Sequence, residues 1–318
     1  MKKPFTIEEH ISLLKDERGL NFRCEEKAKE TLKSISYYRL KGYWWDLQMN
    51  KEELKEIGKS ENDRYFREGN YFEDIIESYN FDRELRVILF DAIEKIEIAL
   101  RTKMINILSL TRNANWYEDS DIFESKVDKY DKEQRTYYKI VLDKLYSECN
   151  RSKEVFIKEH LRKHPDTPLE SWKILETASF GTLSKLYSNL KQVLPEKSEI
   201  SKGLGLNFSK ELSGWLKTFT YIRNIIAHHS RLWGLNMSII PVININNPKG
   251  DWMKVFYVKD IPRKKPFIAI SALLYVYNAI DSENNMKKNI LTLIDKYPKV
   301  QIHKLGFHKK WKSHDIWK

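Results

Sequence analysis

Apolar residues recur every three or four positions along most of this chain, a period that predicts a mainly α-helical protein. The longest apolar stripe follows Asp82 and indicates one long amphipathic helix. Its positions are Leu85, Ile88, Leu89, Ala92, Ile93, Ile96, Leu100 and Met104. A second stripe consists of Leu212, Trp215, Leu216, Phe219, Ile222 and Ile226. Both helices are therefore expected to bury one face.

Shorter helices are expected around these two. Thr6 and Glu9 form a candidate capping box, which opens a helix that stops near Gly19. Further helices are predicted over residues 25–36, 137–149, 155–163, 169–176, 182–193 and 266–281, with a break at Gly181. Between residues 236 and 262, two β-branched runs flank an Asn-Pro-Lys-Gly turn, which predicts a short β-hairpin.

The chain divides into three expected regions. Residues 1–70 are an N-terminal helical region with a basic and aromatic block, and residues 71–236 are a helical core. Residues 237–318 hold the hairpin, a terminal helix and a basic aromatic tail. At 318 residues the chain is long enough to bury a substantial core, as one large domain or two.

The segment RNIIAHHSRLW, residues 223–233, holds the groups best suited to a reaction. Arg223 offers a permanently charged, planar fork that matches phosphate oxygens. His228 and His229 follow it by five and six positions, and a histidine both takes and gives a proton near neutral pH. This combination favours phosphodiester chemistry.

Helix geometry makes the position of Arg223 informative. It falls inside the second apolar stripe, where a guanidinium is costly unless it is paired or lines a site. The plain alternative is that Arg223 neutralises a buried acid and that a histidine caps the helix end. Glu97 is placed to form a surface ion pair with Arg101, and a role beside Arg223 is a second interpretation. His228 lies about 140° from Arg223 round an ideal helix, so two facing copies or a fraying helix end would be needed to bring both to one phosphate.

Four blocks of the sequence together resemble one protein family. Residues 223–233 resemble the RN-x-x-A-H-H-x-R-L-W signature of the Abi-like proteins, the AbiD/AbiF type of abortive-infection protein. SYYRLKGY from residue 36 resembles the family's YYRL-x-GY block, and FDRELR from residue 81 its FDR-x-LR helix start. Trp172, with SFGTLS from residue 179, resembles its W…SFG-x-LS block.

The resemblance implies a fold and an activity. The family is counted among the HEPN ribonucleases, whose signature is R-x(4–6)-H, so a HEPN-type helical bundle with an N-terminal extension is implied. Such a bundle dimerises across the motif helix, which would allow two facing copies to bring Arg223 and His228 to one phosphate. His228 fits the signature and His229 also satisfies its spacing. Abi-like relatives are thought to arrest growth on phage infection, and some are thought to associate with a structured noncoding RNA.

A mechanism follows from the groups present, because RNA supplies its own nucleophile, the 2′-hydroxyl. We expect His228, or alternatively His229, to transfer a proton at the 2′-OH or at the leaving 5′-oxygen. Arg223 would stabilise charge on the phosphoryl oxygens, and Asn224 would orient His228 or hydrogen-bond the phosphate. The expected products are a 2′,3′-cyclic phosphate and a 5′-OH. We expect no metal and no cofactor, since the adjacent histidines lack accompanying carboxylates or cysteines and no glycine-rich nucleotide loop occurs.

Composition agrees with an RNA partner. The formal net charge is +11 and the isoelectric point is near 9.2, which favours an anionic partner, nucleic acid before membrane. Two isolated cysteines and a start without an apolar signal core are typical of a cytoplasmic protein. We therefore expect a cytoplasmic homodimer that contacts RNA as substrate, and a regulatory noncoding RNA is a further candidate partner.

The residues that bind RNA are harder to assign from sequence. Tyr38, Arg39 and Lys41 suit stacking and phosphate contacts, although a helix with its tyrosines in the core explains them equally well. Arg231 is a candidate phosphate contact, and the tail from Gly306 interleaves cations with aromatic residues. Two functions remain open: an endoribonuclease effector of phage defence and a non-cutting RNA-binding protein. A protein-interaction scaffold is a third, which predicts no salt-dependent RNA affinity.

Overall fold

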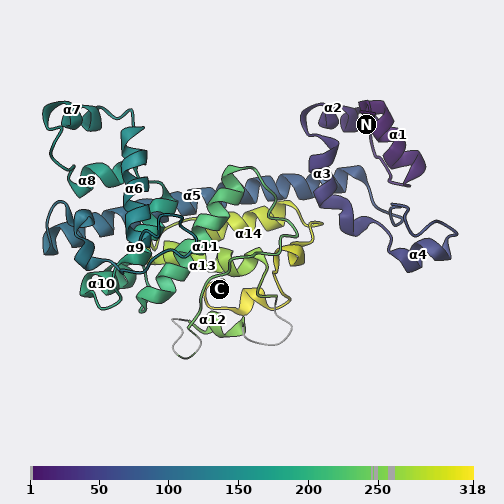
Figure 1. Cartoon of the computed structure of the whole chain (residues 1–318). Coiled ribbons are helices and arrows are strands. Elements are labelled where there is room, and N and C mark those ends of the chain that lie inside the picture. The colour runs from purple at the N-terminus through teal and green to yellow at the C-terminus, as the bar shows by residue number, and fades with distance from the viewer. Residues whose placement is uncertain (1–2, 245, 247–249, 257–261) are drawn as a thin grey trace. The chain divides into compact units, whose positions relative to one another are not determined.

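The computed structural model describes residues 3–244, 246, 250–256 and 262–318 (Figure 1). Across these residues the chain is mainly helical, as the sequence predicts, and β pairing is confined to isolated bridges such as Gln48 with Phe66. None of the described helices is both long and apolar enough to cross a membrane. The chain forms two compact units, which are described separately below.

Unit 1 comprises residues 1–87, 231–235 and 288–305. Its elements are α1 (Ile7–Ser12) with a π-helical continuation (Leu13–Glu17), α2 (Glu25–Ser34), α3 (Tyr37–Trp44) with a 3-10 turn (Trp45–Leu47), α4 (Lys51–Glu56), the first part of α5 (Phe72–Thr111), and a 3-10 turn (Ile302–Leu305). The capping box at Thr6 is formed with Glu9, and Gly19 takes a φ of +70°, so the predicted start and stop of the first helix are confirmed.

Unit 2 comprises residues 88–230, 236–287 and 306–318. Its helices are the remainder of α5, α6 (Tyr137–Asn150), α7 (Val155–Lys163), α8 (Ser171–Ile174), α9 (Phe180–Asn189), α10 (Pro195–Gly203), α11 (Ser209–Ala227), α12 (Asp251–Val255) and α13 (Pro266–Ile280). Helix α14 (Met286–Lys296) begins in unit 2 and ends in unit 1. Short 3-10 turns lie at Trp116–Glu118, Ser120–Ile122, Leu175–Thr177 and Trp311–Ser313.

The two predicted apolar stripes form the core of the long helices. Every position of the α11 stripe is buried, and so is every position of the α5 stripe except the half-buried Ile88. Helix α9 packs along α11, where Gly181 lies against Thr220. The predicted helix pair is present, but its break lies at residues 178–179 and not at Gly181. Ser179 caps α9 by accepting from the Thr182 N–H, so Gly181 lies inside the first turn.

The predicted β-hairpin is also wrong within the described residues. The first β-branched run is an irregular segment that packs on α11: the Val242 carbonyl accepts the indole N–H of Trp215, and the Val242 side chain lies against Gly214. The second run begins inside α12, and its residues 257 and 258 lie outside the described part. Helix α13 confirms the predicted helix at residues 266–281, but α14 follows it, so it is not the terminal one.

Candidate functional site

The motif helix α11 ends in a hydrogen-bonded cap formed by the histidine segment. The His229 N–H donates to the Ile226 carbonyl at 2.9 Å, and the Ser230 N–H donates to the Ile225 carbonyl at 2.8 Å. This pattern is a Schellman motif, in which the residue after the helix adopts the left-handed conformation that glycine favours. His229 occupies that position with a φ of +55°. The helix end is therefore fixed by two hydrogen bonds rather than frayed.

Arg223 lines a pocket between α5 and α11 in unit 2. The pocket has a volume of about 220 Å³ and is lined by Phe90, Ile93, Glu94, Glu97, Ile98, Arg101 and Arg223. The Arg223 side chain is half-buried, as its place in the apolar stripe predicts. Within the described part of the chain, no carboxylate lies within ion-pairing distance of its guanidinium. Arg223 thus lines a site instead of completing a close salt bridge.

Glu97 lines the same pocket as Arg223, but its direct partner is Arg101. The Glu97 carboxylate lies 3.1 Å from Arg101 Nη2, and this pair is partly buried rather than on the surface. Arg101 also donates to the Leu175 and Ala178 carbonyls at 2.9 and 3.0 Å. Burial raises the pKa of Glu97, and the positive charges of Arg101 and Arg223 oppose that rise. Glu97 therefore forms the predicted ion pair with Arg101 and also feels the charge of Arg223, as the second interpretation of the sequence expects.

The other predicted catalytic residues lie outside this pocket. Asn224, His228 and His229 are exposed, and none of them is among the residues that line the Arg223 pocket. Asn224 and His228 are one turn apart, and the His228 N–H donates to the Asn224 carbonyl at 3.0 Å. Among the described residues, His228 therefore does not line the pocket that Arg223 lines.

The predicted RNA-binding residues lie in unit 1, on or beside α3. Tyr38 is 75% exposed and Arg39 is exposed with its guanidinium over the ring of Tyr79. The Arg231 guanidinium lies against the Gly42 backbone, where an added Cβ would come within 3.0–3.1 Å of it, and 5.7 Å from the Tyr43 ring. Arg231 thus packs on the helix of the other predicted binding residues.

Trp45 is an exposed aromatic residue that the sequence interpretation missed. Trp44, which lies in the basic and aromatic block, is fully buried, whereas Trp45 is 57% exposed. The Arg64 guanidinium lies 5.3 Å from the Trp45 ring centroid. The sequence signal for Trp45 is its spacing, because a residue seven positions after Tyr38 lies on the same helix face.

A buried carboxylate joins three of the sequence blocks inside unit 1. Asp82 accepts from the Tyr43 hydroxyl at 2.7 Å and pairs with Arg86 at 2.8 Å. It also accepts the backbone N–H groups of Leu232 and Trp233, at 3.2 and 2.8 Å. Burial raises the pKa of the Asp82 carboxyl, and Arg86 and these hydrogen bonds oppose the rise. The sequence signal was a carboxyl directly before the apolar stripe of α5 and four residues before an arginine.

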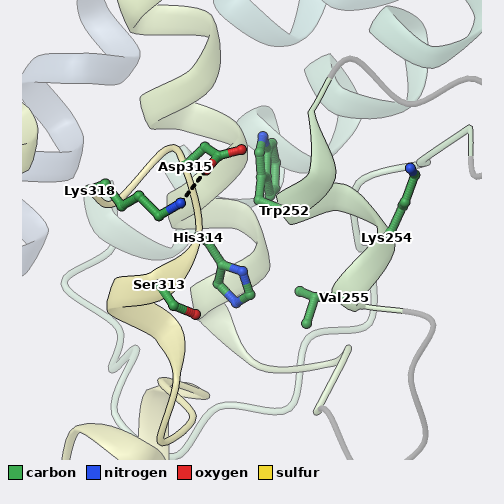
Figure 2. Close-up of a pocket in the computed structure, with 7 residues that line it drawn as sticks. All are labelled: Trp252, Lys254, Val255, Ser313, His314, Asp315 and Lys318. Atoms are coloured by element: carbon green, nitrogen blue, oxygen red, sulfur yellow. Dashed lines mark hydrogen bonds and ion pairs between the residues drawn. The ribbon is translucent and has the colours of Figure 1, made fainter.

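The C-terminal tail is packed onto unit 2 rather than extended. Its rings at Phe307, Trp311 and Trp317 are buried around Phe267, so they are not available to stack on RNA bases. A pocket of about 430 Å³ lies between the tail and α12 and is lined by Trp252, Lys254, Val255, Ser313, His314, Asp315 and Lys318. Figure 2 shows Asp315 paired with Lys318 and the His314 ring beside this pocket.

Comparison with known proteins places the chain in a family. The family model described as Abi-like protein matches residues 30–234. This chain belongs to the Abi-like protein family. The matched span includes all four blocks, from YYRL-x-GY to the R-L-W end of the motif. No curated protein and no solved structure matches the chain. Family membership associates the protein with abortive infection.

Proposed function

We propose that this Abi-like protein is a metal-independent endoribonuclease of the HEPN type and acts as an effector in phage defence. The observation that carries the proposal is Arg223, a half-buried guanidinium that lines a pocket at the end of the helix that presents His228 and His229. No carboxylate of the described residues pairs closely with this cation, so keeping it in an apolar stripe has an electrostatic cost, which an incoming phosphate would offset.

The proposed reaction uses the 2′-hydroxyl of RNA as the nucleophile. His228 takes the proton from that hydroxyl or gives one to the departing 5′-oxygen, a role worth about 10²- to 10⁴-fold in rate. Arg223 stabilises the charge that develops on the phosphoryl oxygens. Asn224, one turn before His228, orients it or donates to the phosphate. The strand is left with a 2′,3′-cyclic phosphate on one side and a 5′-OH on the other.

We further propose that the working site is completed by a second copy of the chain. Within one copy, Arg223 faces a pocket whose lining does not include His228. Two apolar side chains at that pocket, Phe90 and Ile98, are 42% and 44% exposed, which suits a surface that another copy covers. The HEPN resemblance implies the same dimer.

The activity is tested with bulk cellular RNA in EDTA, followed by mapping of the new ends. The variants Arg223→Ala and His228→Ala are compared with Arg162→Ala and His164→Ala, which change an exposed arginine and an exposed histidine of unit 2. We expect 5′-OH ends from the parent protein and both controls, and none from the two motif variants. Cleavage that persists in the motif variants would refute the assignment.

The composite site is tested by mixing the two inactive variants. If Arg223 acts with His228 of the other copy, a mixed dimer of Arg223→Ala and His228→Ala contains one complete site and regains cleavage. If each copy uses its own pair, the mixture stays inactive although light scattering shows a dimer. A monomer that cleaves RNA would also exclude the composite site.

A non-cutting RNA-binding protein is the second candidate function. It is favoured by the exposed aromatic and basic residues of α3, which need no reacting group. In that case His228→Ala would leave phage protection and RNA affinity intact, and the parent protein would leave RNA uncut.

A further inference from the structure

Helix α3 and the turn after it present aromatic rings and cations in alternation. We define the α3 face as Tyr38, Lys41, Trp45 and Arg64, all in unit 1. The Lys41 ammonium lies 6.0 Å from the ring centroid of Tyr38 and 6.0 Å from that of Trp45. The Arg64 guanidinium lies on Trp45 from the adjoining loop. The order along the face is ring, cation, ring, cation.

Neither exposed ring is accounted for by packing. Tyr38 and Trp45 are 75% and 57% exposed, whereas their sequence neighbours Tyr37 and Trp44 are buried and fill the core under α3. Tryptophan is a highly buried residue on average, so leaving this much of its surface in water is uncommon. The two rings lie seven residues apart, about 10 Å along a helix, on the same face.

The α3 face carries two cations, Lys41 and Arg64, and the charge of the neighbouring Asp46 is matched by a lysine. Asp46, next to Trp45, pairs with Lys304 at 2.8 Å. Asp63, next to Arg64, accepts the Ser60 N–H at 3.0 Å. A partner that carries negative charges and flat apolar groups therefore fits the face better than an acidic peptide alone.

We propose that the α3 face is a stacking platform for the unpaired bases of single-stranded RNA. Tyr38 and Trp45 stack on two bases, and Lys41 and Arg64 contact the phosphates between and beside them. A single strand exposes the flat faces of its bases and alternates them with phosphates, whereas a duplex hides those faces in its own stack. This inference rests on the proposed function only in taking RNA as the ligand. It adds that the RNA bound at the α3 face is single-stranded rather than duplex.

The test is fluorescence anisotropy with a labelled oligouridine and with a labelled RNA duplex of equal length. His228→Ala is the background for all proteins so that the RNA stays intact, and circular dichroism checks that each variant is folded. Trp45→Ala and Tyr38→Ala are compared with Tyr130→Ala, an exposed tyrosine of unit 2. Loss of one stacked base should weaken oligouridine binding by roughly 5- to 150-fold, while Tyr130→Ala leaves it unchanged.

Further variants separate stacking from plain attraction between charges. Trp45→Phe keeps a flat ring and should retain most of the oligouridine affinity. Arg64→Ala should reduce the salt dependence of binding by about one phosphate contact. Trp45→Ala should change duplex affinity much less than oligouridine affinity. Equal losses on both RNAs, or an affinity that Trp45→Ala leaves unchanged, would overturn the proposal.

The remaining outcomes distinguish this inference from the proposed function. If the parent protein cleaves RNA and Trp45→Ala binds oligouridine normally, the α3 face is not a stacking platform but the ribonuclease proposal stands. If Trp45→Ala loses oligouridine binding and the parent protein cuts no RNA, the platform stands and the ribonuclease proposal fails. If Trp45→Ala dissociates a dimer without loss of RNA affinity, the occupant of this face is a second copy of the chain and the inference is wrong.

Discussion

Removal of the Asp82 carboxylate should be one of the most damaging single changes in unit 1. Asp82→Ala removes the carboxylate that pairs with the Arg86 guanidinium, whose side chain is only 7% exposed. Removing one partner of a buried ion pair costs about 3–5 kcal/mol. The Leu232 and Trp233 N–H groups lose their acceptor as well, at about 1–3 kcal/mol for an unsatisfied buried group. Because these costs share one network, we expect a total of about 4–6 kcal/mol rather than their sum.

Urea unfolding followed by circular dichroism measures this loss. The two units need not unfold together, so the transition that Asp82→Ala shifts identifies unit 1. Arg83→Ala is the matched control, since Arg83 is exposed on the next position of α5 and should cost less than about 0.5 kcal/mol. The double variant Asp82→Ala with Arg86→Met removes both charges and should recover about 2–4 kcal/mol.

Two results would refute this reasoning about Asp82. A loss below about 1 kcal/mol in Asp82→Ala would mean that the network contributes little beyond the cost of burying its charges. A double variant no more stable than the single one would mean that the backbone N–H groups, and not the loss of the ion pair with Arg86, dominate the cost. Tyr43→Phe, which removes only one donor, should cost about 1 kcal/mol in either case.

Three further outcomes are expected. His229→Gly should raise the free energy of unfolding by about 0.5–1 kcal/mol, because glycine adopts the left-handed conformation at this position without strain. The same variant should still cleave RNA if His228 is the catalytic histidine. Burial lowers the pKa of Lys197 to about 8, so between pH 8 and pH 10.5 the unfolded chain binds more protons than the folded one and stability rises with pH. From pH 7 to pH 10, the free energy of unfolding of the parent protein, measured in urea, should therefore rise by roughly 2–3 kcal/mol relative to that of Lys197→Met. Burial also lowers the pKa values of His308 and His314, whose Nε2 atoms lie 2.7 Å apart. The stability that these neutral histidines contribute above pH 6.5 should therefore be lost on acidification to pH 5, which thermal unfolding measures. In His314→Gln, the fall in melting temperature between pH 6.5 and pH 5 should be smaller than in the parent protein.

Local periodicity was sufficient to predict most of the helical fold. The stripes on α5 and α11 are local features, and a helix that buries one stripe needs no knowledge of its partners. The same period placed Arg223 among apolar neighbours, which anticipated its half-buried position at a pocket. The start of α5 at Phe72 was missed, although Phe72, Ile75 and Phe81 are buried along its first turns, because the expected start follows the FDR-x-LR block.

Features that depend on distant partners could not be predicted in the same way. Asp82 meets Tyr43 and Trp233, which lie 39 and 151 residues away in the chain, and no local pattern links them. The run at Val242 has strand propensity, but the Val242 carbonyl accepts a hydrogen bond from the Trp215 indole N–H and the segment is irregular. The choice between Trp44 and Trp45 as the exposed ring depends on where α3 passes into a 3-10 turn, which composition does not reveal.

The family blocks divide by unit, and this division separates a buried network in unit 1 from the proposed catalytic groups in unit 2. The YYRL-x-GY, FDR-x-LR and R-L-W blocks lie in unit 1, where Tyr43, Asp82 and the backbone of Trp233 form one buried network. The SFG-x-LS block and the R-x4-H pair lie in unit 2, where Ser179 starts the helix that packs on α11. The chain crosses from one unit to the other between Ser230 and Arg231, directly after the histidines. A change at Asp82 should therefore weaken unit 1 and the RNA affinity proposed for it, while the helix that carries the proposed catalytic groups stays folded. A change at His228 should leave both units folded and abolish the proposed cleavage.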